Sequence, residues 1–137
     1  MIEKNRKIFS KPEVLKATLE YFKGDSLAAE VWIKKYCLKD ENNLYELTPD
    51  DMHRRLAKEL ARIEIKYPNG LSEDQIYETI KEFKRIVPQG SPMSGIGNDF
   101  QVVSLSNCFV IGNKGNSDSY GGILKIDQEQ IQLMKRR

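Results

Sequence analysis

One segment of this sequence, Phe100 to Ile111, is rich in residues that favour β-structure, and no second segment is available to pair with it. A lone strand leaves a row of backbone N–H and C=O groups without partners, and even an isolated hairpin is marginal in water. The last helical segment also ends at Lys135-Arg136-Arg137 without a glycine or proline stop signal. We therefore expect an incomplete fold, whose strand pairs with another polypeptide or with residues outside this sequence.

The composition is compatible with a packed core and limits the classes of partner that we expect. The 137 residues are 39% hydrophobic and 31% charged, and 22 basic residues balance 20 acidic ones to a net charge of +2. This balance gives no case for a nucleic acid or a membrane surface as partner. No apolar run is long enough to cross a membrane, and the charged N-terminus is not followed by the apolar stretch of a signal peptide. We expect a soluble, cytoplasmic protein.

Charge and glycine are unevenly distributed along the chain. Most of the charged residues lie in residues 1–90, whereas most of the glycines lie in residues 90–122. The first part is typical of helices with solvated faces, and the second of extended chain and turns. Four helices are predicted in the first part, beginning after the capping residues Ser10, Asp25, Thr48 and Ser72.

The predicted helix ends are set by turn residues. Gly24 ends the first helix, Tyr67-Pro68-Asn69-Gly70 ends the third, and Pro88 blocks continuation of the fourth, which is expected to include Phe83 and Val87. Residues 88–99 are predicted to form a loop, residues 100–111 a strand and residues 112–122 a second loop. A last helix is expected from Ile123 to Arg137.

Three side chains are candidates for chemistry. Cys108 is either a buried free cysteine that packs as a small hydrophobe or a redox thiol. Cys37, beside Trp32 and Tyr36, is expected to be structural. The single histidine, His53, is expected to be an exposed helix residue, because no His/Cys spacing offers it fellow metal ligands. No metal site is predicted.

The order of several short motifs resembles the N-terminal part of the ribonucleotide reductase catalytic chain. A Ser-Pro loop at 91–92 precedes a Ser-x-Cys strand at 106–108, and Asp118-Ser119-Tyr120-Gly121-Gly122-Ile123 follows as a loop that opens a helix. Upstream, Gly24 to Trp32 with Lys35-Tyr36 and Leu38-Lys39-Asp40 resembles the family's opening helix and turn, and Thr48 to Ala61 resembles the helix that follows. The resemblance spans residues 20–137.

The resemblance implies an α+β fragment. Residues 1–90 would form an N-terminal helical domain. Residues 91–137 would be the start of the catalytic barrel, with the substrate loop, the redox-cysteine strand and the effector-site loop and helix. Together these would supply the first strand and helix of a ten-stranded α/β barrel that another chain completes.

The resemblance also implies roles for individual residues. Cys108 would be the first of two redox cysteines that reduce the ribose and end as a disulfide. Ser91 would bind the substrate phosphate, and Ser106 and Asn107 would help to hold the ribonucleotide. Asp118 and Ser119 would lie at the allosteric site for a deoxynucleotide or ATP effector.

The family's cofactor and partners are implied in the same way. Adenosylcobalamin, held by residues outside this chain, would generate the radical, with a di-metal class as the alternative. The partners would be the C-terminal portion of the reductase, a ribonucleotide substrate, a thioredoxin-like reductant and a second copy of the assembled chain, without nucleic acid or membrane. The chain would be a split or truncated ribonucleoside-diphosphate or -triphosphate reductase, inactive alone.

Two other functions fit parts of the sequence. A non-catalytic helical interaction module that adds its strand to a partner's sheet explains the unpaired strand without using Ser91, Cys108 or Asp118. A self-contained redox protein fits less well, because Cys108 has no resolving cysteine nearby and Cys37 lies in a different element.

Overall fold

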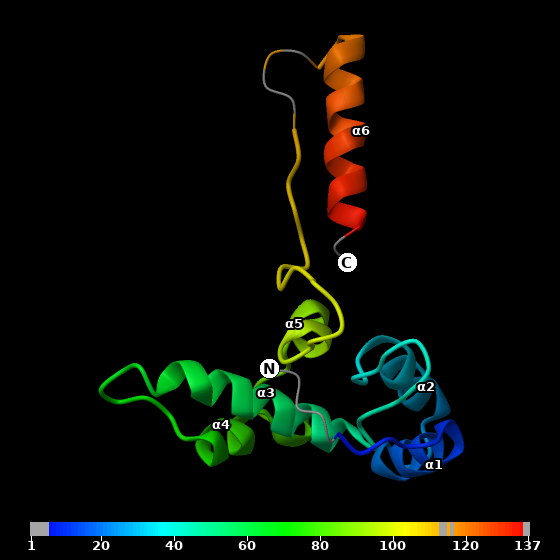
Figure 1. Ribbon diagram of the computed structural model, residues 1–137, viewed down its shortest axis with the longest axis vertical. Helices are drawn as coiled ribbons and strands as arrows, with labels where there is room; N and C mark the ends of the chain where they lie inside the picture. Colours follow the sequence, from blue (N-terminus) through cyan, green and yellow to red (C-terminus); the bar gives the residue numbers. More distant parts are fainter. Residues whose placement is uncertain (1–5, 113–114, 116, 136–137) are drawn as a thin grey trace.

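The computed structural model describes residues 6–112, 115 and 117–135. Six α-helices and one 3-10 helix are formed in these residues, and their order is shown in Figure 1. Their bounds are α1 Lys11–Tyr21, α2 Ser26–Lys35, α3 Pro49–Glu64, α4 Glu73–Ile80, η1 Lys81–Phe83, α5 Gly90–Gly95 and α6 Tyr120–Met134. No helix in the described part of the chain is both long and apolar enough to span a bilayer.

The four predicted helix starts are confirmed. The backbone N–H of Ser10 donates to the Glu13 carboxylate at 2.8 Å, and the Asp25 side chain accepts from the N–H of Ala28 at 2.9 Å. Thr48 and Ser72 begin α3 and α4 with capping boxes. These side chains satisfy N–H groups that the first helical turn leaves free, so local sequence alone determines where the helices begin.

The core lies where α1, α2, α3 and α4 meet. Its members are buried apolar side chains spaced at helical intervals, and α5 adds one methionine to them. They are Val14, Trp32, Ile33, Cys37, Met52, Leu56, Ala57, Ile76, Ile80 and Met93. This cluster gives residues 9–96 an interior of their own, and the helical character predicted for the first part of the chain is confirmed. The domain boundary at residue 90 stays a prediction.

Two predicted helix boundaries and one predicted loop are wrong. The fourth helix ends at Ile80 rather than near Val87, because Glu82 and Phe83 adopt positive φ angles of 53° and 58°. Residues 88–99 contain α5, whose Pro92 lies in the first turn, where no intrahelical N–H bond is lost. The last helix begins at Tyr120 rather than Ile123, because the Ser119 side chain caps it by accepting the N–H of Gly122.

The predicted strand takes a different form. Residues 101–111 form an irregular, mostly extended segment, and among the described residues they form no strand ladder. The β-bridges in the described residues are isolated and join Leu44 to Phe9 and to Lys39. Pairing of residues 100–111 with a further sheet thus stays a prediction. Figure 1 shows this segment leading from α5 to α6, which stands apart from α1–α4.

Candidate functional site

The structure brings together Ser91, Ser106 and Asn107, the three residues predicted to bind substrate. The backbone N–H of Ser91 donates to Asn107 Oδ1 at 2.8 Å, and the Ser91 hydroxyl donates to the carbonyl of Ser106 at 3.3 Å. The Asn107 amide also donates to the side-chain oxygen of Gln89. Residues separated by about fifteen positions are therefore held side by side between α5 and the extended segment.

Apolar contact holds the same two segments together further along. A methyl group placed on Gly95 would lie 2.6 Å from Val103 Cγ2 and 2.9 Å from Leu105 Cδ2. The segment therefore packs directly on the end of α5, and a larger residue at position 95 would require the side chains of Val103 and Leu105 to shift.

A pocket of about 400 Å³ opens beside this cluster. Its polar lining comes from two places: Ser91, Ser94, Ser104 and Asn107 come from the second part of the chain, and Lys35 and Tyr36 come from the end of α2. The resemblance gave no role to Lys35 or Tyr36 beyond a motif match. Their presence makes the pocket a junction between the helical domain and the segments predicted to bind substrate.

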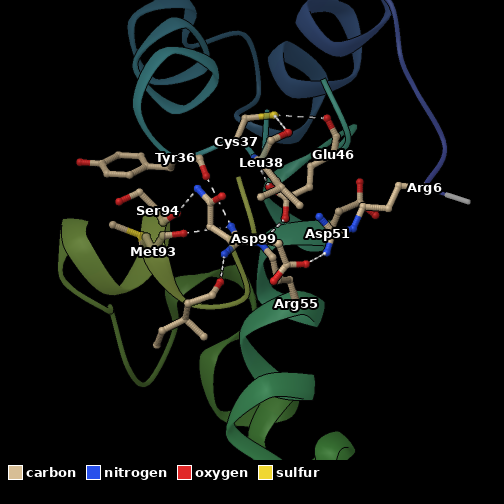
Figure 2. A network of polar contacts seen from close by, with 12 residues as sticks. Arg6, Tyr36, Cys37, Leu38, Glu46, Asp51, Arg55, Met93, Ser94 and Asp99 are labelled. Atoms are coloured by element: carbon tan, nitrogen blue, oxygen red, sulfur yellow. Dashed lines mark hydrogen bonds and ion pairs between the residues drawn. The ribbon is translucent and has the colours of Figure 1, made fainter. Parts of the chain in front are cut away.

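A buried ion pair holds this junction in place (Figure 2). Arg55 Nε lies 2.7 Å from Glu46 Oε1, and the second carboxylate oxygen accepts the N–H of Leu38 at 2.7 Å. The Arg55 guanidinium also donates to the carbonyls of Met93, at 2.9 Å, and of Ile96. One side chain on α3 thus connects the segment after α2 with α5.

The segment Tyr36 to Asp40, which carried part of the resemblance, is a structural turn. Lys39 Nζ donates to the carbonyls of Ile33 and Lys34 at 3.2 and 2.5 Å, which satisfies the C-terminal end of α2. Asp40 accepts from the Tyr45 hydroxyl at 2.5 Å and from the N–H groups of Asn42 and Asn43. The hydrogen bond from Tyr45, together with those from Asn42 and Asn43, lowers the pKa of Asp40 to about 2.

The two cysteines lie in different environments. Cys37 is 5% exposed, and its thiol donates to the carbonyls of Leu38 and Glu46. Burial, together with the nearby Glu46 charge, raises the pKa of the Cys37 thiol to about 12, which makes it a poor nucleophile and agrees with a structural role. Cys108 is exposed, directly after Asn107, so it is not the buried hydrophobe of the first interpretation.

Asp118 and Ser119 are exposed and lie at the start of α6, where Ser119 is the capping residue. Figure 1 shows this helix start at the far end of the extended segment from α5. The structure therefore separates the predicted effector residues from the Ser91 cluster. In the described part of the chain, no three His, Cys, Asp or Glu side chains are grouped so that they could hold a metal ion.

His53 is the clearest error of the sequence prediction. It is fully buried rather than exposed, and its ring lies edge-on to Phe83 with 4.6 Å between the ring centroids. Neither ring nitrogen has a hydrogen-bond partner within the described residues. Burial lowers the pKa of His53, and the charge of Asp50 partly opposes this effect.

Comparison with known proteins agrees with this architecture. Residues 22–93 match the family model described as the all-alpha domain of ribonucleotide reductase. The match covers more than half of the chain, and the chain belongs to this family. No curated protein and no solved structure matches it. The matched residues include the whole segment from α2 to the first turns of α5, and hence Lys35, Tyr36, Arg55 and Ser91.

Proposed function

We propose that this chain is the N-terminal segment of a ribonucleotide reductase catalytic chain and takes part in the reduction of ribonucleotides to deoxyribonucleotides. The observation that carries the proposal is the cluster of Ser91, Ser106 and Asn107 beside a polar pocket. This cluster joins directly to the helical domain that matches the family. Serine hydroxyls and an asparagine amide are suitable groups for a phosphorylated sugar.

Cys108 is proposed as the first redox cysteine. Its exposure and its position next to Asn107 would place a thiol at the edge of the substrate cluster, within reach of a protein reductant. In the reaction, the ribose 2′-hydroxyl leaves as water. Cys108 and a second cysteine, on the C-terminal portion of the reductase, together give two electrons and become a disulfide. A thioredoxin-like protein would then reduce that disulfide.

The remaining assignments depend on the family resemblance. Asp118 and Ser119 are proposed to bind a deoxynucleotide or ATP effector, and α6 to pack in a dimer of the assembled chain. Adenosylcobalamin, bound by residues outside this chain, would supply the radical. The described residues group no ligand set for a metal ion, and no role in binding this cofactor is assigned to them.

A substitution at Cys108 tests the proposal. When the chain is combined with the C-terminal portion of the reductase and a dithiol reductant, we expect Cys108→Ser to abolish multiple turnovers, because no disulfide can form. Deoxyribonucleotide production is the measurement. Cys37→Ser is the matched control and should keep turnover, because a hydroxyl can donate to the same two carbonyls. Full activity of Cys108→Ser would contradict the role.

A second function is favoured by the extended segment. Residues 101–111 expose Val102 and Val110 and form no ladder among the described residues, as expected of a strand that joins a partner's sheet. Such an interaction module would use neither the serines nor Cys108. A ribonucleotide titration of the complex with the partner distinguishes the two, because only the reductase is expected to respond.

A further inference from the structure

We propose that Lys35 and Tyr36 complete the pocket beside Ser91 as an anion-binding site, and that Lys35 provides the charge that holds the phosphate groups of a nucleotide. The inference rests on the proposed function, since it names the ligand group that the same pocket takes. It assigns a direct binding role to the helical domain, in addition to its role as a scaffold.

The position of these two residues is fixed from both sides. Lys35 is the last residue of α2, and the backbone N–H of Tyr36 donates to the carbonyl of Trp32 at 2.8 Å. The neighbouring side chains of Trp32 and Cys37 are both buried in the core. The end of α2 is therefore anchored, and Lys35 and Tyr36 are presented from a rigid element.

Tyr36 and Asn107 converge on Gly90. A methyl group placed on Gly90 would lie 3.4 Å from Tyr36 Cε1, 3.6 Å from Tyr36 Oη and 3.6 Å from Asn107 Oδ1. Figure 2 shows the Tyr36 ring beside Ser94, which lines the same pocket. The end of α2, the first turn of α5 and the segment around residue 107 thus line one open pocket together.

The charge in this space has one sign. Lys35 is the single charged residue among those that line the pocket, and the other polar lining residues are Tyr36, Ser91, Ser94, Ser104 and Asn107. No ion pair or hydrogen bond ties the Lys35 ammonium to another described residue. A lining that contains a lysine, several hydroxyl groups and no carboxylate suits a phosphate or diphosphate group.

The adjacent residue, Lys34, is a suitable control for Lys35. Lys34 is also exposed and lies next to Lys35, but it lines a different pocket of mixed charge, where Glu30, Asp40 and Glu41 accompany Lys11 and Lys39. The three carboxylates there offset the charge of the lysines, whereas no carboxylate lines the pocket beside Lys35. The two lysines therefore differ in their surroundings rather than in their own chemistry or position along the helix.

The test is a titration of the 137-residue chain with inorganic pyrophosphate and with a ribonucleoside diphosphate, followed by heteronuclear NMR. We expect saturable shifts at the amides of Ser91 and Asn107, weakened about tenfold by Lys35→Gln, as for the loss of one charge-assisted contact. Lys34→Gln should change the affinity little, and Lys35→Arg should retain most of it. Unchanged melting temperatures would show that the variants are folded.

Other outcomes separate this inference from the proposed function. Equal binding by Lys35→Gln and the unchanged chain, equal losses in Lys34→Gln and Lys35→Gln, or no saturable binding would overturn the role of Lys35. If Lys35→Gln has no effect while Cys108→Ser still stops turnover in the assembled enzyme, the reductase function stands without this role. If pyrophosphate binding depends on Lys35 but the assembled chain forms no deoxyribonucleotide, the anion site stands and the reductase function fails.

Discussion

Arg55 shows how a single residue positions the candidate site. The Arg55 side chain is 10% exposed, and its guanidinium pairs with Glu46 and donates to carbonyls of α5 and its C-cap residue, so its hydrogen-bonding capacity is used almost entirely inside the protein. A buried pair of this kind contributes more to a unique arrangement of segments than to net stability. The pocket at the end of α2 depends on this arrangement, because Arg55 is what ties α5 to the segment after α2.

At the residue scale, His53 makes the free energy of unfolding depend on pH. Its pKa is lowered by burial, so the folded chain binds this proton less readily than the unfolded chain does. The stability that the neutral ring provides is present above the ordinary pKa of 6.5 and is lost as the pH falls below it. We expect the free energy of unfolding, from urea melts, to decrease on acidification from pH 7 to pH 5.

His53→Leu is the matching variant, since it fills the same apolar space without a titrating group, and its stability should be nearly constant over this interval. The carboxylates with lowered pKa values do not interfere. Asp40 loses its contribution between its ordinary pKa of 3.8 and about 2, well below the His53 interval. Parallel pH profiles for the unchanged chain and His53→Leu would show that another group is responsible.

At the scale of elements, the end of α4 is set by backbone strain rather than by proline. Glu82 and Phe83 both adopt positive φ angles, which is unfavourable for residues other than glycine. The turn directs Phe83 back onto His53, and this contact with a core residue is the compensating interaction. The sequence carried no turn signal here, because neither residue is of a type that favours the left-handed region.

Glycine scanning across this boundary tests the strain. Glu82→Gly should raise the free energy of unfolding by about 1 kcal/mol, because glycine adopts the positive φ angle without penalty. Glu78→Gly, in α4 itself, should lower it by about 1 kcal/mol. The two are matched, since each removes one exposed ion pair, Glu82 with Lys84 and Glu78 with Lys81. Destabilisation by both substitutions, measured in denaturant melts, would argue against strain at Glu82.

The sequence predicted elements well where the controlling interaction was local. Helix starts at Ser10, Asp25, Thr48 and Ser72 follow from side chains that bond within three residues. Other features depend on contacts distant in sequence and carried no readable signal. Arg55 reaches α5 across about forty residues, and His53 is buried because Phe83 folds back over it.

The residues of the candidate site were likewise predictable only in part. The resemblance identified Ser91, Ser106 and Asn107, and the structure places these three together. Lys35 was not identified, because a lysine at the end of a charged helix looks like any solvated residue until the pocket is seen. Whether Asp118 and Ser119 bind an effector stays a prediction.

At the scale of the whole molecule, packing is uneven. Residues 9–96 enclose a shared core, whereas α6 exposes Tyr120, Leu124, Ile131 and Met134 and buries little beyond Gly122. A helix of this length is marginal in water without tertiary packing. The exposed apolar residues of α6 and of the segment before it therefore favour a partner surface, as expected if further polypeptide completes the barrel.

Deoxyribonucleotide formation is the most direct test of the central claim, that this chain works as part of a ribonucleotide reductase. The chain, the C-terminal portion of the reductase and their mixture are each supplied with ribonucleotide, effector, adenosylcobalamin and a dithiol reductant. We expect product from the mixture and none from either component alone. No product from a mixture that demonstrably forms a complex, or equal production by the C-terminal portion alone, would contradict the account.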